Sequence, residues 1–185
     1  DNLKRRLAFS TVGQLGYVVL GATLATEQGV GGSVLHIAMH AFGKITLFFC
    51  AGAIFVASGK KYVSELRGLG RKMPITMGAF MIGSLSVICL PPLGGFVSKW
   101  YIALGALDRD ATWVVAVLLI SSLLNVFYLL PVAVTAFFRT DDSEEDQVIK
   151  EAPLACVVPL SLTAIGCFVL FFLADPLLQL VGIMD

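Results

Sequence analysis

Long apolar blocks separated by short polar stretches make up most of this 185-residue sequence. Five blocks have about 20 residues or more, the length that an α-helix needs to cross a bilayer core of roughly 30 Å. They cover residues 7–25, 34–57, 74–107, 112–138 and 153–173. The pattern therefore predicts an all-α membrane protein with five transmembrane segments.

The third block contains a helix-breaking run. Pro91 and Pro92 lack backbone donors and clash with the preceding turn. Gly94 and Gly95 then add conformational freedom. We expect the helix to break here. In a membrane, unwound backbone persists only where it is buried in protein or lines a wet cavity. Helices broken at mid-depth are typical of transporters.

Residues 1–185 are expected to form a single membrane region without a soluble domain. Loops are expected at residues 58–73 and 139–152, and the acidic run 141–146 in the second loop is typical of a solvated linker. Residues 174–185 include a short amphipathic stretch at the interface. The sequence opens on a cationic stretch without an initiator Met or signal peptide, so we expect an N-terminal portion to be missing.

Composition supports the membrane interpretation. Hydrophobic residues make up 57% of the chain and charged residues 14%, against about 25% charged residues in soluble domains. The formal net charge is zero, so no basic field indicates nucleic-acid binding. The four cysteines lie in apolar blocks without C-x-x-C spacing, and we interpret them as small core residues. They are Cys50, Cys89, Cys156 and Cys167.

The basic residues predict an orientation. An alternating topology places residues 4–6, 60–72 and 139–150 on one side, and these regions hold ten Lys and Arg residues. The opposite side holds only Arg109. The positive-inside rule then places the start of the chain in the cytoplasm and its C-terminus outside.

Lys44 lies in the middle of the second block. An ammonium group there costs at least about 2.5–3.5 kcal/mol on insertion scales. Snorkelling would require it to climb about ten residues, roughly 15 Å, which is too far. We therefore expect Lys44 to face the interior of the bundle and to be functional.

His36, His40 and Lys44 are spaced i, i+4, i+8. In a helix they drift only about 80° while rising about 12 Å, so they form one titratable stripe. Waters or rotamer changes must bridge neighbours roughly 6 Å apart, because a hydrogen bond spans only about 3 Å. This arrangement predicts a proton relay, although a lone membrane histidine could equally form a structural hydrogen bond. No metal site is expected, since H-x-x-x-H lacks the zincin glutamate and no carboxylate lies within a membrane segment.

Lys99 follows the predicted break and would lie in the second half-helix, with Ser98 and Tyr101 as local partners that could hold waters. Snorkelling is a stronger alternative here, because Lys99 lies nearer a helix end. Five further polar groups in the membrane segments could hold waters or form helix–helix hydrogen bonds. They are Ser10, Thr11, Gln14, Asn125 and Tyr128.

Three ordered motifs resemble one known family. Residues 3–17, LKRRLAFSTVGQLGY, are similar to its K-R-x-L-A-Y-S-T-x-S-Q-x-G-Y stretch. His36, His40 and Lys44 resemble its H-x-x-x-H-x-x-x-K helix, and residues 91–99 its P-P-x-x-G-F-x-S-K broken helix. These are motifs of the antiporter-like subunits shared by respiratory complex I (NADH:quinone oxidoreductase) and Mrp-type multisubunit Na⁺/H⁺ antiporters. Residues 95–106, 121–125 and 174–178 look closest to the D-type component of the Mrp antiporters.

The resemblance implies a fold of about fourteen helices with two inverted five-helix repeats, of which this chain supplies most of the second repeat and the last helix. It makes Lys44 the central lysine of the second half-channel and Lys99 the broken-helix residue near the exit. His36 and His40 then link the hydrated path between the two lysines.

The expected function is proton translocation by one membrane subunit of a multisubunit cation/proton antiporter in a prokaryotic plasma membrane. Protons, with Na⁺ as a second candidate ion, and neighbouring membrane subunits are the implied partners. One alternative is a proton-pumping subunit of complex I or a membrane-bound hydrogenase, and another is a structural scaffold without transport. No redox, nucleotide or nucleophile–base motif is visible, so no cofactor and no enzyme activity are expected of the chain itself.

Overall fold

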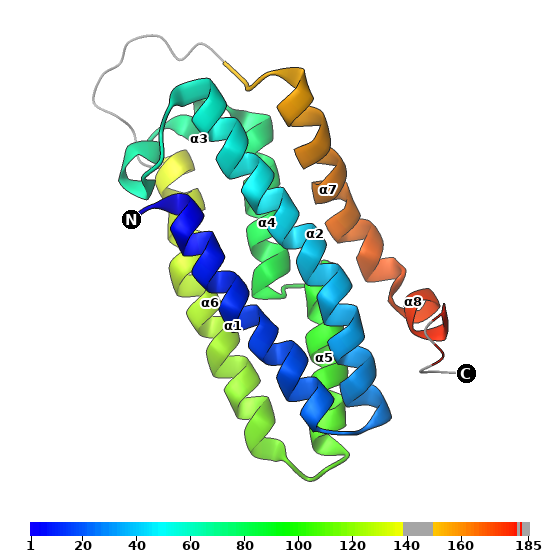
Figure 1. The fold of residues 1–185 in the computed structure, drawn as a ribbon. Helices are drawn as coiled ribbons and strands as arrows, with labels where there is room; N and C mark the ends of the chain where they lie inside the picture. The colour runs from blue at the N-terminus through cyan, green and yellow to red at the C-terminus, as the bar shows by residue number, and fades with distance from the viewer. Residues whose placement is uncertain (139–149, 181, 183–185) are drawn as a thin grey trace.

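The computed structural model describes residues 1–138, 150–180 and 182. Apart from one isolated bridge between Asn2 and Tyr62, the regular structure in these ranges is helical (Figure 1). The elements are α1 (Leu3–Thr23), α2 (Glu27–Ser58), the 3-10 turn η1 (Val63–Leu66), α3 (Leu69–Lys72), α4 (Pro74–Ile88), α5 (Gly94–Leu107), α6 (Thr112–Phe138), α7 (Leu154–Phe172) and α8 (Ala174–Leu180). The predicted all-α class is confirmed. The acidic run 141–146 lies outside the described residues.

Helix α2 is the centre of the bundle, because it packs against α1, α4, α5 and α7. Helix α6 lies beyond α1 and α4, and α7 runs along the opposite side of α2 (Figure 1). Helices α4 and α5 follow one another along the bundle as two halves of one interrupted helix (Figure 1). Both halves therefore lie against the long central helix, and their junction faces its middle.

Within the described residues, three helices are long and apolar enough to cross a membrane by themselves, namely α2, α6 and α7. Helix α1 is less apolar than these three helices, and α4 is apolar but shorter. The predicted number of five membrane-spanning segments therefore stays a prediction. The outer surface of the bundle is nevertheless apolar. Large side chains such as those of Phe9, Trp113 and Phe127 are about two-thirds exposed, as expected where lipid or neighbouring membrane subunits replace water.

The predicted helix break is confirmed, and it lies at residues 89–93 between α4 and α5. Cys89 ends α4 in the left-handed region with φ 72°, and the Pro91–Pro92 bond is cis. The expectation for Gly94 and Gly95 differs from the structure, because both already lie in the first turn of α5. A Cβ atom at Gly95 would clash with the Ser86 carbonyl oxygen. The glycine therefore allows the half-helices to approach closely.

Side-chain caps fix the ends of the first helices. Asn2 Oδ1 accepts a hydrogen bond from Arg5 N at 3.0 Å at the start of α1, and Thr26 Oγ1 accepts one from Gly29 N at 3.1 Å at the start of α2. At the start of α4, Glu151 accepts from Ile75 N at 2.6 Å and from Thr76 Oγ1 at 2.7 Å. Glu151 thus joins the segment before α7 to the start of the broken helix.

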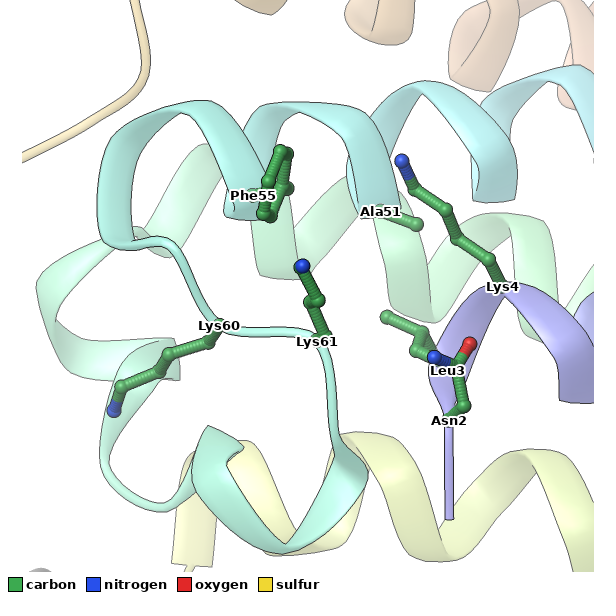
Figure 2. A pocket seen from close by; sticks show the side chains of 7 residues that line it. All are labelled: Asn2, Leu3, Lys4, Ala51, Phe55, Lys60 and Lys61. Carbon is green, nitrogen blue, oxygen red and sulfur yellow. The ribbon is translucent and has the colours of Figure 1, made fainter.

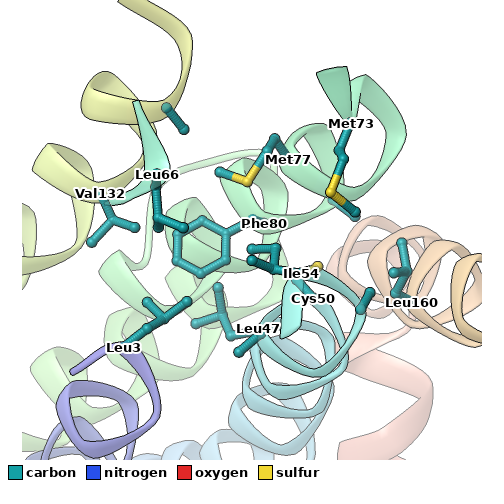
Figure 3. Close-up of a cluster of buried hydrophobic side chains, with 14 of the residues drawn as sticks. Leu3, Leu47, Cys50, Ile54, Leu66, Met73, Met77, Phe80, Val132 and Leu160 are labelled. Atoms are coloured by element: carbon teal, nitrogen blue, oxygen red, sulfur yellow. The ribbon is translucent and has the colours of Figure 1, made fainter. Parts of the chain in front are cut away.

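A large apolar cluster fills the end of the bundle where the chain begins (Figure 3). Phe80 of α4 is fully buried in this cluster, which also contains side chains from α1, α2, α6, α7 and η1. Other members are Leu3, Leu47, Ile54, Leu66, Met77, Val132 and Leu160. This packing holds the helices together next to the polar interior described below.

Candidate functional site

The buried face of α1 supplies half of a polar interior. Its buried residues recur every three or four positions, the spacing of one helix face. They are Leu3, Leu7, Ser10, Gln14, Tyr17 and Gly21. Three of these six side chains are polar and face the bundle rather than the surroundings. This polar face explains why α1 is the least apolar of the long helices.

His36 of α2 lies between α1 and α5. Its Nδ1 atom is hydrogen bonded to Ser98 Oγ at 2.8 Å, and its Nε2 atom to Gln14 Oε1 at 3.2 Å. Only 1% of His36 is exposed. Both ring nitrogens are therefore engaged, as an imidazole requires if it is to receive a proton on one nitrogen and release one from the other.

His40 continues the stripe one turn along α2. Its ring stacks on that of His36, with centroids 5.7 Å apart and planes 7° apart. Both of its nitrogens are buried and have no hydrogen-bond partner among the described residues, and the same holds for Ser84 Oγ. The two histidines are in register, as the i, i+4 spacing predicts. A proton can pass between them only through a bridging water or a rotamer change.

Lys44 completes the stripe and is 5% exposed. Its Nζ atom donates to the Leu7 carbonyl oxygen of α1 at 3.0 Å. The ammonium group thus points into the bundle against a backbone dipole, and snorkelling is excluded in this arrangement. No carboxylate forms an ion pair with it within residues 1–138, 150–180 and 182.

Lys99 of α5 is also turned inward, with 7% of the residue exposed. Its Nζ atom donates to Ser122 Oγ of α6 at 2.8 Å and lies 4.0 Å from the centroid of the Tyr17 ring. Such a desolvated cation–π contact is worth about 2 kcal/mol or more. Lys99 and Ser122 also line a cavity of about 470 Å³ between α5 and α6, whose other walls are largely apolar.

The structure gives the two expected local partners of Lys99 direct hydrogen bonds to other groups, and their role in holding water stays a prediction. Ser98 is fully buried and bonds His36 and the Gly95 carbonyl oxygen instead. The Tyr101 hydroxyl donates to Asp175 Oδ1 at 3.2 Å, at the start of α8. Residues adjacent in a helix sequence project in different directions. Lys99 therefore finds its partners on α1 and α6, which the sequence does not place beside it.

A second polar chain runs between α1 and α6. Tyr128 Oη donates to Asn125 Oδ1 at 2.7 Å, and Asn125 Nδ2 donates to Tyr17 Oη at 3.2 Å. Ser10 bonds the Tyr128 hydroxyl and Tyr17 bonds Ser121. An amide has a fixed donor end and a fixed acceptor end. The Asn125 amide therefore orients the two tyrosines but does not relay protons as freely as hydroxyls or imidazoles do.

Tyr17 connects this chain to His36 and Lys99. The Lys99 ammonium group lies over its ring, and the ring meets that of His36 edge-on with centroids 5.5 Å apart. Neither Tyr17 nor Ser122 is among the site residues expected from the sequence, and Gln14 was expected either to hold water or to join two helices. A signal was present in the sequence. Gln14 and Tyr17 lie on one face of α1, and Ser121, Asn125 and Tyr128 share the i, i+4, i+7 spacing of one face of α6.

The resulting site holds two buried lysines whose recorded partners are all uncharged. Their partners are a carbonyl oxygen, a hydroxyl group and an aromatic ring. No group of three His, Cys, Asp or Glu side chains suited to a metal ion occurs in the described ranges. Burying a charge without a counter-charge is costly. The interior brings two lysines and two histidines into one region between α1, α2, α5 and α6.

Comparisons with known proteins show the family and the fold to which the chain belongs. The model of the family described as "NADH:quinone oxidoreductase/Mrp antiporter, TM" matches residues 1–125. NADH-quinone oxidoreductase subunit N of Desulforudis audaxviator is 39% identical over 180 residues, covering 91% of this chain and 36% of that protein. F(420)H(2) dehydrogenase subunit L of Methanosarcina mazei is 35% identical and matches 100% of this chain and 28% of its own length.

A solved structure shares the fold. A chain of the membrane-bound sulfane sulfur reductase, an archaeal respiratory membrane complex, superposes with a TM-score of 0.86 at 30% identity. The match covers 99% of the present chain and 37% of that chain. The sequence thus spans roughly a third of the length of these similar proteins.

Proposed function

Because the chain belongs to the family of NADH:quinone oxidoreductase and Mrp antiporter membrane subunits, we propose that it is part of a subunit that moves protons across a membrane. Lys44 and Lys99 are the two principal proton-holding groups, and His36 and His40 connect them. Neighbouring membrane subunits of the same complex drive the movement, because the sequence carries no recognisable redox or hydrolytic motif.

The observation that carries the proposal is the inward placement of two lysines without a counter-charge among the described residues. Lys44 donates to a backbone carbonyl and Lys99 to a serine hydroxyl. Since intramembrane ionisable groups are expensive, a purely structural protein would gain nothing from two of them. His36 lies between the lysines and reaches the α5 half-helix through Ser98, so the stripe on α2 and the broken helix form one connected interior.

His40 is the gate in this proposal. Its ring nitrogens lack protein partners among the described residues, so proton passage between Lys44 and His36 depends on water entering around His40. Proton transfer between Lys44 and His36 would then start or stop as water enters or leaves the space around His40.

A redox-driven complex is the more strongly supported setting. The relatives compared above are named as subunits of NADH-quinone oxidoreductase and F(420)H(2) dehydrogenase. Their names favour proton pumping coupled to electron transfer over Na⁺/H⁺ exchange. The resemblance to the D-type component of Mrp antiporters stays a prediction, and the ion gradient or electron donor that drives flux separates the two.

The test is proton movement in inverted vesicles that carry the full-length protein in its assembled complex. Lys44→Met and Lys99→Met keep the side-chain length and remove the charge, and Lys150→Met is the matched control, an exposed lysine outside the helices. We expect either interior variant to lower donor-driven proton flux at least about tenfold, the effect of roughly 1.4 kcal/mol on a rate, and the control to leave it unchanged.

Assembly is verified on the same vesicles by the electron-transfer rate and by native gel mobility. Undiminished flux in both interior variants would contradict the relay and leave the scaffold alternative. Flux that follows an imposed Na⁺ gradient, and not an electron donor, would place the protein in the antiporter class.

A further inference from the structure

A second candidate site lies at the end of the bundle away from Lys99, where α1 begins and α2 ends. A pocket of about 270 Å³ is lined there by Asn2, Lys4, Phe55 and Lys61, with Leu3, Ala51 and Lys60 completing the wall. Figure 2 shows the side chains of Lys4 and Lys61 rising toward α2, whereas that of Lys60 points away. The pocket therefore presents two ammonium groups from two separate segments of the chain.

The two ammonium groups converge on one aromatic ring. Lys4 Nζ lies 5.2 Å and Lys61 Nζ 5.0 Å from the centroid of Phe55. Two like charges that face the same ring repel each other, and each cation–π contact at an exposed site offsets only about 0.5–1 kcal/mol. An anion between the lysines would remove this repulsion.

The two acidic side chains nearest in sequence make their hydrogen bonds to other groups, although the charges of Lys60 and Lys61 also act on the Glu65 carboxylate. Asp1 Oδ2 accepts a hydrogen bond from Ser64 Oγ at 2.6 Å. Glu65 accepts hydrogen bonds from Lys61 N and Tyr62 N, each at 2.9 Å, and these bonds, that of Tyr62 first, hold the pKa of the Glu65 carboxyl below its usual range. Both carboxylates thus serve the η1 turn. The lysine head groups form no ion pair within the part of the chain that the structure describes.

The position of the pocket selects the kind of anion. It lies at the ends of two long helices, the level of lipid head groups in a membrane, and on the side that the Lys and Arg count makes cytoplasmic. Below it the exposed surface turns apolar. Phe48 lies two helical turns before Phe55 on the same face of α2, and both are more than a third exposed. Ala8, one turn after Lys4, is also exposed on α1.

We propose that this pocket binds the head group of an anionic phospholipid, with the phosphate held between Lys4 and Lys61. Asn2 has its Oδ1 engaged by Arg5 N, which leaves the amide NH₂ to donate to a phosphate oxygen. The acyl chains follow the apolar surface past Phe48 toward the membrane interior. Basic pockets between transmembrane helices on the cytoplasmic side suit such head groups. The lipid would fasten the start of α1 to the end of α2, independently of the proton relay.

The experiment uses the full-length protein in its assembled complex, reconstituted into nanodiscs of phosphatidylcholine with a fixed fraction of phosphatidylglycerol. Native mass spectrometry counts the phosphatidylglycerol molecules that intact complexes retain. The double variant Lys4→Gln/Lys61→Gln is compared with Lys72→Gln/Lys150→Gln, which removes the same charge at two exposed positions outside the pocket. We expect the first pair to weaken retention about tenfold and the second to leave it near wild type.

Phe55→Leu provides a second, uncharged variant. It keeps the apolar volume but removes the ring that both ammonium groups face, so we expect it to weaken retention as well. Equal losses in the pocket pair and the control pair would overturn the proposal in favour of general surface charge. Lipid retention by the pocket pair equal to that of wild type would overturn it too, and binding of millimolar inorganic phosphate that the pocket pair alone loses would then make a free anion the ligand.

Discussion

Tyr17 illustrates how one side chain serves two purposes inside the bundle. The Lys99 ammonium group lies 4.0 Å from the centroid of its ring. Its hydroxyl accepts a hydrogen bond from Asn125 Nδ2 and forms another with Ser121. The ring stabilises the charge where it lies, and the hydroxyl fixes the ring. Tyr17 is therefore a positioning residue for Lys99 in the proposed relay.

Two substitutions at Tyr17 separate these contributions. Tyr17→Phe keeps the ring and loses hydrogen bonds worth about 0.6 kcal/mol each in a membrane, so we expect nearly normal proton flux. Tyr17→Leu removes a cation–π contact worth about 2 kcal/mol, and we expect a flux several-fold below that of Tyr17→Phe. Donor-driven flux in vesicles that carry the assembled complex measures both. Equal flux in the two variants would show that the ring does not position Lys99.

At the scale of elements, the broken helix depends on close contact between its halves. Gly95 in the first turn of α5 lies against the Ser86 carbonyl oxygen in the last turn of α4. The contact directs the start of α5 toward α2, where Ser98 meets His36 at 2.8 Å. A small residue at one position thus allows the close approach between the two elements that carry the proposed relay.

Gly95→Ala is expected to destabilise the protein by roughly 1–3 kcal/mol, because the added methyl group meets backbone that cannot rotate away. Gly78→Ala is the matched control in α4, where a Cβ atom would have nothing within 4 Å. The control should be neutral or slightly stabilising, since alanine is the better helix former. Thermal unfolding of the full-length protein in detergent compares the two. Equal melting temperatures would mean that the half-helices can separate without cost.

Across the whole molecule, apolar side chains cover the sides of the bundle, and most basic side chains lie at its ends. The chain is integral to a membrane, and its long helices expose large apolar side chains around their sides. Apart from Lys44 and Lys99, the Lys and Arg residues of the described ranges lie in loops, in α3 or in the first turn of α1. The Lys and Arg count predicts that residues 58–73 are cytoplasmic and that the turn between α5 and α6 is external. Both proposed sites use this arrangement, since the relay crosses the bundle and the lipid pocket lies at its basic end.

Cysteine labelling tests this orientation. We expect Ser64→Cys in the full-length protein to react with a membrane-impermeant maleimide only in inverted vesicles, and Asp108→Cys only in intact cells. Both positions are exposed outside the long helices. A Cys156→Ser background removes the one partly exposed native cysteine in the described ranges, since Cys50, Cys89 and Cys167 are buried. The reverse labelling pattern would contradict the positive-inside assignment.

The sequence by itself determined the helical class, the break near Pro91 and the stripe of His36, His40 and Lys44. These features depend on local chemistry and on the helical repeat, which a sequence records directly. It also predicted that Lys44 points inward, because the cost of an exposed ammonium group at that depth leaves no other arrangement.

Only the tertiary structure decided which partners each buried group has. Ser122 and Tyr17 lie 23 and 82 positions from Lys99 in the numbering of the chain and meet it because α1, α5 and α6 pack side by side. The same packing joins Lys4 and Lys61 over Phe55. Helical periodicity fixes the face on which a residue lies, but the neighbour across that face depends on how helices distant in sequence associate.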